Sequence, residues 1–201
     1  MVLPRHDVPG PRTAELVTFD GLRDGREHIA LVWKSEAATP LVRIHSECLT
    51  GDVFQSARCD CGNQLAETMA LMSENGGILL YLRQEGRGIG LYNKIDAYSL
   101  QDAGADTVDA NTRLGFPADA RRYDVAADML AALGHRDIRL LTNNPEKVSG
   151  LMLAGIRVED RVGTSVFVSP DNLGYLQTKR FRMGHALSLG DAEPERVSAT
   201  G

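Results

Sequence analysis

Residues 63–91 read NQLAETMALMSENGGILLYLRQEGRGIGL. Leu65, Met69 and Met72 recur at helical spacing, which predicts a helix over residues 63–75 that ends at the glycine pair 76–77. The apolar run ILLYL at 78–82 is continuous, as expected for a buried strand. A helix, a buried strand and a glycine-rich loop are therefore predicted in direct succession.

The segments on either side continue this alternation. Toward the N-terminus, 28–34 (HIALVWK) and 40–45 (PLVRIH) are typical of strands with a turn between them. Toward the C-terminus we expect helices over 89–103, 124–133 and from Pro145 to near Gly155, and strands at 138–141 and 156–162. The pattern predicts an α/β fold with a mixed sheet flanked by helices. We expect one domain over residues 13–187 with flexible tails at 1–12 and 188–201, which are polar and lack an apolar period.

The overall charge and hydropathy limit the classes of partner. The chain of 201 residues carries 22 basic and 27 acidic residues, a formal net charge of −5. No global field attracts nucleic acid or anionic lipid, so any bound phosphate must meet a local basic cluster. No apolar run approaches the roughly 20 residues that span a bilayer, and residues 1–13 lack the apolar segment of a signal peptide. We expect a cytoplasmic protein without nucleic-acid or membrane partners.

All the cysteines lie in one short segment, at Cys48, Cys59 and Cys61. Thiolates suit zinc, and three of them leave one tetrahedral position for a water whose pKa falls to roughly 7 on the metal. A catalytic zinc is therefore the more informative interpretation. The alternatives are a structural zinc closed by His45 and three unrelated buried thiols. Glu47, beside the first cysteine, either moves protons at the bound water or forms a surface ion pair.

Three loops are candidates for anion binding. Residues 83–91 (RQEGRGIGL) follow the buried strand and precede a helix, with glycines that permit close backbone approach and with Arg87 as a phosphate ligand. The spacing fits neither the Walker loop nor the dinucleotide fingerprint, so a glycine-rich turn with a solvated arginine is an open alternative. Residues 142–147 offer the hydroxyl of Thr142 and a mobile Lys147. A lysine in the first turn of a helix opposes the helix dipole, so a bound phosphate explains its charge better than helix stability does. Residues 119–122 pair a carboxylate with guanidinium groups, or form an ordinary exposed charge cluster.

Four long motifs in order carry a family resemblance: RIHSECLTGDVFQSARCDCG (43–62), RQEGRGIGLYNKIDAYSLQD (83–102), DTVDANTRLGFPADAR (106–121) and LLTNNPEK (140–147). With them the chain resembles the GTP cyclohydrolase II family over roughly residues 13–187. The resemblance implies a zinc ion, one per chain, held by Cys48, Cys59 and Cys61. It also implies GTP as substrate, magnesium with the triphosphate, and a homodimer.

The resemblance also implies the residues of the site. The implied catalytic residues are Tyr98, Asp119 and Arg121. The implied nucleotide contacts are Arg43, Ile44, His45, Ser46, Glu47, Gln64, Glu85, Gly86, Arg87, Thr107, Thr142 and Lys147.

The implied reaction converts GTP and water to formate, pyrophosphate and 2,5-diamino-6-ribosylamino-4(3H)-pyrimidinone 5′-phosphate, the first step of riboflavin biosynthesis. Zinc-bound hydroxide would attack C8 of the purine, and Tyr98 would orient or protonate the opened ring, unless it is an ordinary half-buried tyrosine. Family models make Arg121 a nucleophile on the α-phosphate with Asp119 as proton acceptor. A guanidinium is protonated up to a pKa above about 12, so our alternative is that Arg121 only neutralises charge in the transition state.

Three rival functions follow from the same residues. An enzyme of this kind could stop at the formamidopyrimidine nucleotide or serve a specialised pathway. A catalytically silent GTP-binding regulatory protein would keep the zinc as a structural element. A nucleic-acid-binding zinc module is disfavoured by the negative charge and by the absence of paired zinc-knuckle spacing.

Overall fold

The computed structural model describes residues 1–3 and 13–189 and confirms the predicted α/β class. A mixed sheet of seven strands runs in the order β1-β2-β3-β5-β4-β6-β7. β1, β2, β3 and β5 pair antiparallel, whereas β5, β4, β6 and β7 pair parallel. The strands are β1 (Val2–Leu3), β2 (Ala14–Thr18), β3 (Ile29–Trp33), β4 (Leu41–Ser46), β5 (Gly77–Leu82), β6 (Asp137–Leu141) and β7 (Arg157–Val162).

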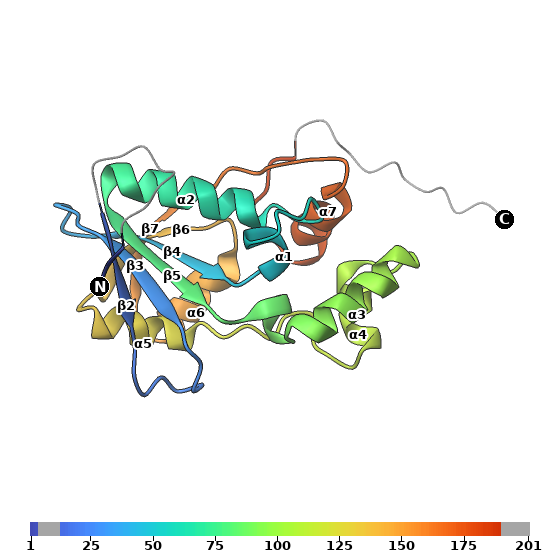
Figure 1. Cartoon of the computed structure of the whole chain (residues 1–201), viewed down its shortest axis with the longest axis horizontal. Helices are drawn as coiled ribbons and strands as arrows, with labels where there is room; N and C mark the ends of the chain where they lie inside the picture. The colour runs from blue at the N-terminus through green and yellow to red at the C-terminus, as the bar shows by residue number, and fades with distance from the viewer. Residues whose placement is uncertain (4–12, 190–201) are drawn as a thin grey trace.

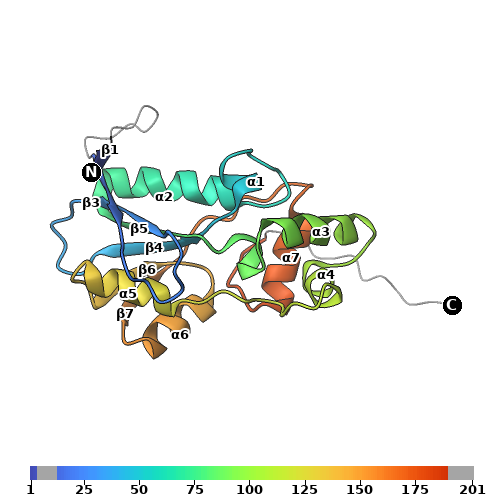
Figure 2. The same ribbon diagram turned by 60° about the horizontal axis from the view of Figure 1, so that its bottom comes forward.

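Helices cover both faces of this sheet (Figures 1 and 2). The helix α2 (Cys61–Asn75) lies on one face, and α5 (Asp124–Ala132) and α6 (Pro145–Leu153) lie on the other. α1 (Leu49–Asp52), α3 (Leu91–Asp102), α4 (Thr107–Arg113) and α7 (Leu173–Arg182) gather at one end, beyond a 3₁₀ turn at Glu85–Gly88. Among the described residues no helix has the length and apolarity needed to cross a membrane.

The central strand β5 shows why its apolar run is continuous. Successive side chains of a strand point to opposite faces. Leu79 packs with Trp33 and Met72 beneath α2, whereas Leu80 packs with Met129 and other residues beneath α5 and α6. Because both faces of β5 are covered, its apolar residues follow one another without the alternation of a half-exposed strand.

The ends of the parallel strands determine where a site can form. β4, β5 and β6 are adjacent and parallel, so their carboxyl ends meet at one edge of the sheet. The segments that leave this edge begin at Glu47, Arg83 and Thr142. These are the three segments in which the sequence places the cysteines, the glycine-rich loop and the TNNPEK motif.

Most predicted elements are present, but some were missed. The turn after β3 does not make a hairpin, because β5 lies between β3 and β4. The sheet begins at Val2–Leu3, inside the predicted N-terminal tail, because β1 pairs with β2. At the other end Leu189 is buried against Leu176 and Leu187. The other residues of the two predicted tails, apart from Met1 and Ser188, lie outside the described part of the chain.

The missed helices lack a strong apolar stripe. α4 buries only Ala110 and Asn111, and α7 buries only Leu176 and Thr178. One local signal for α4 was present, since the Asp106 side chain accepts hydrogen bonds from the backbone N–H groups of Val108 and Asp109 and so caps the helix.

Candidate active site

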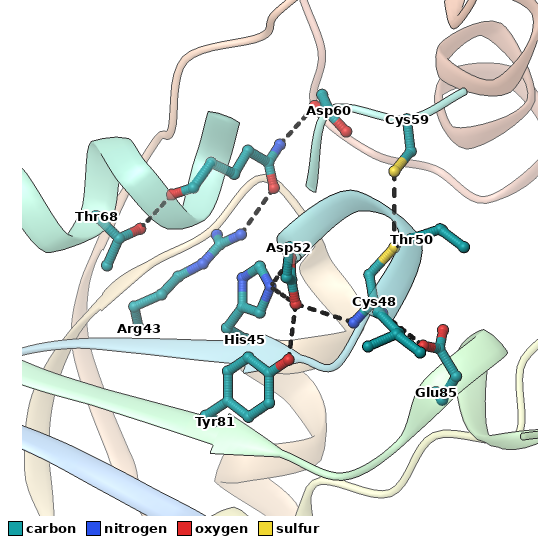
Figure 3. A network of polar contacts seen from close by, with 12 residues as sticks. Arg43, His45, Cys48, Thr50, Asp52, Cys59, Asp60, Thr68, Tyr81 and Glu85 are labelled. Atoms are coloured by element: carbon teal, nitrogen blue, oxygen red, sulfur yellow. Dashed lines mark hydrogen bonds and ion pairs between the residues drawn. The ribbon is translucent and has the colours of Figure 1, made fainter. Parts of the chain in front are cut away.

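The three cysteines converge at the end of the sheet beyond β4. Cys48 precedes α1, and Cys59 and Cys61 lie at the start of α2. Their Sγ atoms lie within 4.8 Å of one another, and the sulfurs of Cys48 and Cys59 are 3.7 Å apart (Figure 3). Within the described residues no fourth histidine, cysteine or carboxylate joins this group.

Two glycines make room for the cluster. A Cβ at Gly51 would lie 2.9 Å from the sulfur of Cys59, and one at Gly62 would lie 2.3 Å from the carbonyl oxygen of Gly51. Gly62 is thus needed for close packing of α1 on α2 rather than for a left-handed turn.

The donor set fits a soft divalent cation. Hydrogen bonds from the other two thiols lower the pKa of Cys48. Hydrogen bonding to Cys48 raises the pKa of Cys59 to about 11, and contacts with both partners raise that of Cys61. Without a cation only one of the three sulfurs is readily ionised, whereas a metal would stabilise all three as thiolates.

His45 does not close the metal site. Its Nε2 lies 3.0 Å from an oxygen of Asp52, and its ring stacks on Tyr81 with centroids 5.5 Å apart (Figure 3). The same carboxylate accepts hydrogen bonds from the Tyr81 hydroxyl at 2.8 Å and from the backbone N–H of Cys48 at 3.0 Å. Asp52 therefore orients His45 and fixes the backbone of the first cysteine.

Lys94 of α3 brings a positive charge to the thiol cluster. Its buried Nζ donates to Sγ of Cys48 at 3.2 Å, to Oγ1 of Thr50 at 3.0 Å and to Oε1 of Glu85 at 2.8 Å. Burial by itself lowers the pKa of Lys94, but the neighbouring Cys48 and Glu85 raise it by more. The pKa therefore lies above its ordinary value, and the ammonium stays charged. Glu85 also accepts from the backbone N–H of Leu49 at 2.6 Å and so joins α1 to the glycine-rich loop.

The glycine-rich loop has the predicted backbone freedom. Gly86, Gly88 and Gly90 all have positive φ. Arg87 also adopts the left-handed conformation, at φ 59° and ψ 33°, which is strained for a residue with a side chain. A Cβ at Gly88 would lie 2.8 Å from the carbonyl oxygen of Ala120, so the loop packs directly on the segment 119–121.

That packing places the predicted acid–base pair. The guanidinium of Arg121 donates to both carboxylate oxygens of Asp119, at 2.9 and 3.0 Å through Nε. Burial lowers the pKa of Arg121, but Tyr123 and Asp119 raise it above its ordinary value. Burial raises the pKa of Asp119, but Arg121 lowers it overall. A guanidinium held this firmly in its protonated form is a stabiliser of negative charge and a poor nucleophile.

Two adjoining pockets meet at Arg87 and Arg121. We call the first the cysteine pocket, which is lined by the three cysteines together with Ser46, Glu47, Arg58, Glu85, Gly86, Arg87, Ile89, Lys94, Ala97, Tyr98, Gln101, Thr107, Asn111, Arg121 and Tyr175. We call the second the basic pocket, which is lined by Arg43, His45, Ser46, Cys61, Gln64, Arg87, Arg121, Thr142, Asn143, Asn144, Lys147, Thr164, Tyr175, Lys179, Met183, His185 and Leu187.

Polar atoms without a partner concentrate around the basic pocket. Buried polar groups in proteins are normally hydrogen-bonded, so such a concentration indicates a missing ligand. Among the described residues that line this pocket, the buried atoms without a hydrogen-bond partner are Nε of Arg43, Nδ1 of His45, Oγ of Ser46, Nη1 and Nη2 of Arg87, Nδ2 of Asn144 and Nε2 of His185. The described lining has no carboxylate, so an anion fits this pocket and a free cation does not.

Lys147 differs from its predicted mobile state. Its Nζ is buried and donates to the backbone carbonyl of Ile44 at 2.7 Å. Burial, with the neighbouring charges of Arg43, Arg121 and Lys179, holds its pKa well below the ordinary value. The lysine is therefore fixed in place before any ligand arrives, and an anion in the pocket would favour its charged form.

The other predicted site residues fall into two groups. Ser46 lines both pockets, while Glu47, Thr107 and Tyr98 line the cysteine pocket, and Gln64 and Thr142 line the basic pocket. Glu47 also forms an ion pair with Arg83, with Nε and Oε2 2.9 Å apart. The ion pair that the sequence analysis gave as an alternative is therefore present, and the same residue lines the pocket. The side chain of Ile44 lies in the core, and only its backbone reaches the site. Asp119 lines neither pocket but accepts hydrogen bonds from Arg121, which lines both.

Several site residues were missed in the sequence. Lys94 lies inside a recognised motif, yet a lysine at a helical position usually reads as a solvated charge. Tyr175, Lys179 and His185 belong to α7 and the segment after it, where no apolar pattern marked an element. The local signal was a cluster of two aromatic and several basic residues over 175–185.

Comparisons with known proteins identify relatives of the chain. The model of the family GTP cyclohydrolase II matches residues 5–163. The chain is 55% identical over 177 residues to a GTP cyclohydrolase-2 of Psychromonas ingrahamii, covering 87% of this chain and 88% of the relative. It is 54% identical over 179 residues to a GTP cyclohydrolase-2 of Vibrio cholerae, covering 88% and 90%. A riboflavin biosynthesis protein of Vibrio vulnificus is 51% identical over 185 residues, which cover 90% of this chain and 50% of that protein.

Proposed function

Because the chain belongs to the GTP cyclohydrolase II family, we propose that it hydrolyses GTP to the diaminopyrimidinone nucleotide, formate and pyrophosphate, the first step of riboflavin biosynthesis. One observation carries the proposal. The pocket that is lined by the three cysteines adjoins a pocket that is lined by hydrogen-bond donors without partners, and Arg87 and Arg121 line both pockets. This matches a substrate with a reactive ring at one end and a triphosphate at the other.

The two pockets suggest the orientation of GTP. The guanine would occupy the cysteine pocket, and the triphosphate would occupy the basic pocket with its α-phosphate at Arg121. Arg43 supports this assignment, because its buried guanidinium donates to the carbonyl of Leu141 at 3.1 Å and to Gln64 at 2.8 Å and keeps Nε without a partner. A buried arginine with an unused N–H is a preorganised phosphate ligand.

Cys48, Cys59 and Cys61 would hold a zinc ion, which when bound supplies a Lewis acid and an activated water for hydrolysis of the imidazole ring. Lys94 balances the charge that three thiolates bring, because it lies 3.2 Å from the sulfur of Cys48. Tyr98 lines the cysteine pocket, with its hydroxyl 3.5 Å from Oγ1 of Thr50. We assign it to orient the opened ring and to give it a proton.

For the bond between the α- and β-phosphates we favour electrostatic stabilisation. Arg121 would neutralise the charge that develops on the phosphoryl oxygens, and Asp119 would hold the guanidinium in place through its two hydrogen bonds. A covalent guanylyl adduct on Arg121, found by mass spectrometry after rapid quenching, would contradict this assignment.

We also propose magnesium with the triphosphate, a homodimer and a cytoplasmic location, as the family resemblance implies. Since the described lining of the basic pocket has no carboxylate, magnesium would take its oxygen ligands from the phosphates and from water. Light scattering on the purified protein measures its molar mass and so tests whether it is a dimer.

Incubation with GTP, zinc and magnesium tests the proposed function. We expect formate, pyrophosphate and the diaminopyrimidinone nucleotide, each identified by mass. Pyrophosphate with a formamidopyrimidine nucleotide and no formate would support the early-stopping rival. GTP binding without any product would support the silent regulatory protein.

A further inference from the structure

The C-terminal part of the domain forms a wall of the basic pocket. α7 and the residues after it contribute Tyr175, Lys179, Met183, His185 and Leu187 to that pocket. Figures 1 and 2 show α7 at the same end of the molecule as α1, α3 and α4, where the site lies. This segment lies after residue 163, where the family match ends.

Lys179 is the cation of this wall. Its Nζ lies 3.1 Å from Oδ1 of Asp60 and 4.3 Å from the centre of the Tyr175 ring. Its ammonium has three N–H donors, and the hydrogen bond to Asp60 takes one of them. Donors therefore remain for a ligand in the basic pocket.

His185 is the second polar group of this wall. Its Nε2 is buried without a partner. Its backbone N–H donates to the carbonyl of Lys179 at 3.1 Å, and the next N–H, of Ala186, donates to the carbonyl of Asn143 at 3.0 Å. These bonds fasten the segment to the loop that carries Thr142 and Lys147.

The charge around His185 also favours an anion. Burial and then the charges of Lys179, Arg121, Lys147 and Arg87 lower its pKa to about 3. A neutral imidazole beside these basic side chains can donate one N–H to a phosphate oxygen without adding a further positive charge to the pocket.

The division of the pockets indicates which phosphates are concerned. Arg121 lines both pockets, whereas Lys179 and His185 line only the basic pocket. With the α-phosphate at Arg121, the chain of phosphates continues toward these two residues. We propose that Lys179 and His185 bind the β- and γ-phosphates of GTP, so that the C-terminal wall distinguishes a nucleoside triphosphate from a monophosphate. This inference rests on the proposed function.

A purely structural role is the competing explanation for Lys179. Asp60 is completely buried between Cys59 and Cys61, and its other oxygen accepts from Gln64 at 2.7 Å. If Lys179 only held Asp60 in place, its loss would disturb the cysteine cluster and would weaken every ligand alike.

The experiment compares two ligands on the full-length, zinc-loaded protein. Calorimetry measures the Kd of a GTP analogue with a methylene group between the α- and β-phosphorus atoms, and the Kd of GMP. For Lys179→Met we expect about tenfold or weaker binding of the analogue and unchanged binding of GMP, since one charge-assisted hydrogen bond contributes about that factor. For His185→Leu we expect a smaller loss with the same selectivity. The matched control is Arg180→Met, an exposed neighbour on the same helix, which should bind both ligands as the wild type does.

Each outcome decides between the roles. Equal weakening of both ligands by Lys179→Met, with reduced zinc content, would assign Lys179 to the support of Asp60 and overturn the proposal for this residue. Unchanged analogue binding in both variants would overturn it altogether. His185→Leu leaves the pair of Lys179 with Asp60 intact and decides the matter if Lys179→Met does not fold. Failure of the wild type to bind the analogue would count against the proposed function itself.

Discussion

At the scale of single residues, the site contains side chains whose placement is unfavourable without a ligand. Arg87 is strained in the left-handed region and leaves both terminal nitrogens without partners. Lys147 is buried beside other cations. Such groups persist where the surrounding structure imposes them, and each becomes favourable when an anion is bound.

Lys147→Met tests this conflict between stability and binding. The folded-state pKa of Lys147 is depressed, so between that pKa and the unfolded value near 10.4 the unfolded chain binds the extra proton, and stability rises with pH. Methionine removes the buried amine, so we expect a higher melting temperature at neutral pH and a difference that shrinks as the pH approaches 10. Triphosphate affinity should fall at least tenfold, by roughly the worth of one charged hydrogen bond. Thermal melts and calorimetry measure both; a lower melting temperature together with unchanged affinity would contradict the assignment.

Tyr98→Phe tests proton donation to the opened ring. Burial raises the pKa of Tyr98, so its hydroxyl keeps its proton at neutral pH. We expect formate release to slow roughly 100-fold, as for loss of a general acid, and pyrophosphate release to change much less. Quenched-flow assays of both products measure this. The matched control is Tyr92→Phe on the same helix, where the side chain is 84% exposed; equal slowing of both products by Tyr98→Phe would remove the residue from the deformylation step.

At the scale of elements, the site is an assembly of loops from one sheet edge. The segments after β4, β5 and β6 meet because these strands are parallel neighbours. Small contacts then set the fine geometry. Ala120 donates its backbone N–H to the carbonyl of Arg87 at 3.0 Å, and Gly88 lies against the carbonyl of Ala120. The glycine-rich loop thus positions Asp119 and Arg121.

Gly88→Ala tests that packing. Gly88 and Gly90 both have φ of 92°, a backbone conformation that L side chains rarely adopt, so alanine strains the backbone at either position. Only at Gly88 would the new Cβ meet a neighbour, at 2.8 Å from the Ala120 carbonyl, whereas no atom lies within 4 Å at Gly90. We expect Gly88→Ala to lower kcat for pyrophosphate release at least tenfold beyond Gly90→Ala, with zinc content unchanged. Equal kcat values in the two variants would show that the contact does not position Arg121.

At the scale of the whole molecule, the hydrophobic core and the cysteine cluster are separate. The hydrophobic clusters of the described residues lie between the sheet and α2, between the sheet and α5 with α6, and under α7. None of these clusters includes Cys48, Cys59 or Cys61. The cores on the sheet therefore form without the cysteines, and we expect a bound metal to stabilise mainly the junction of α1 and α2.

Zinc removal tests this separation. We expect a chelator at neutral pH to stop formate production and to lower the melting temperature by several degrees. The far-ultraviolet circular dichroism spectrum should stay nearly unchanged at 25 °C, and added zinc should restore activity. Loss of the folded spectrum on chelation would instead support a structural zinc.

The secondary structure predicted from sequence is right where packing imposes a period. β5 is buried on both faces, and α2, α5 and α6 each bury one stripe, so their apolar residues recur visibly in the chain. α1, α4 and α7 bury few side chains and gather around polar pockets. Their sequences carry no such period, and the sequence analysis missed them.

The sequence by itself determined the α/β class, the cysteine trio and the loops that meet at the site, because these depend on local composition and spacing. Only the tertiary structure decided that His45 bonds to Asp52 and does not join the three cysteines. It also decided that Lys94 donates a hydrogen bond to the sulfur of Cys48, and that Lys179 and His185 line the basic pocket. Each of these contacts joins residues whose distance is set by strand order and helix packing. A contact of that kind leaves no periodic trace along the chain.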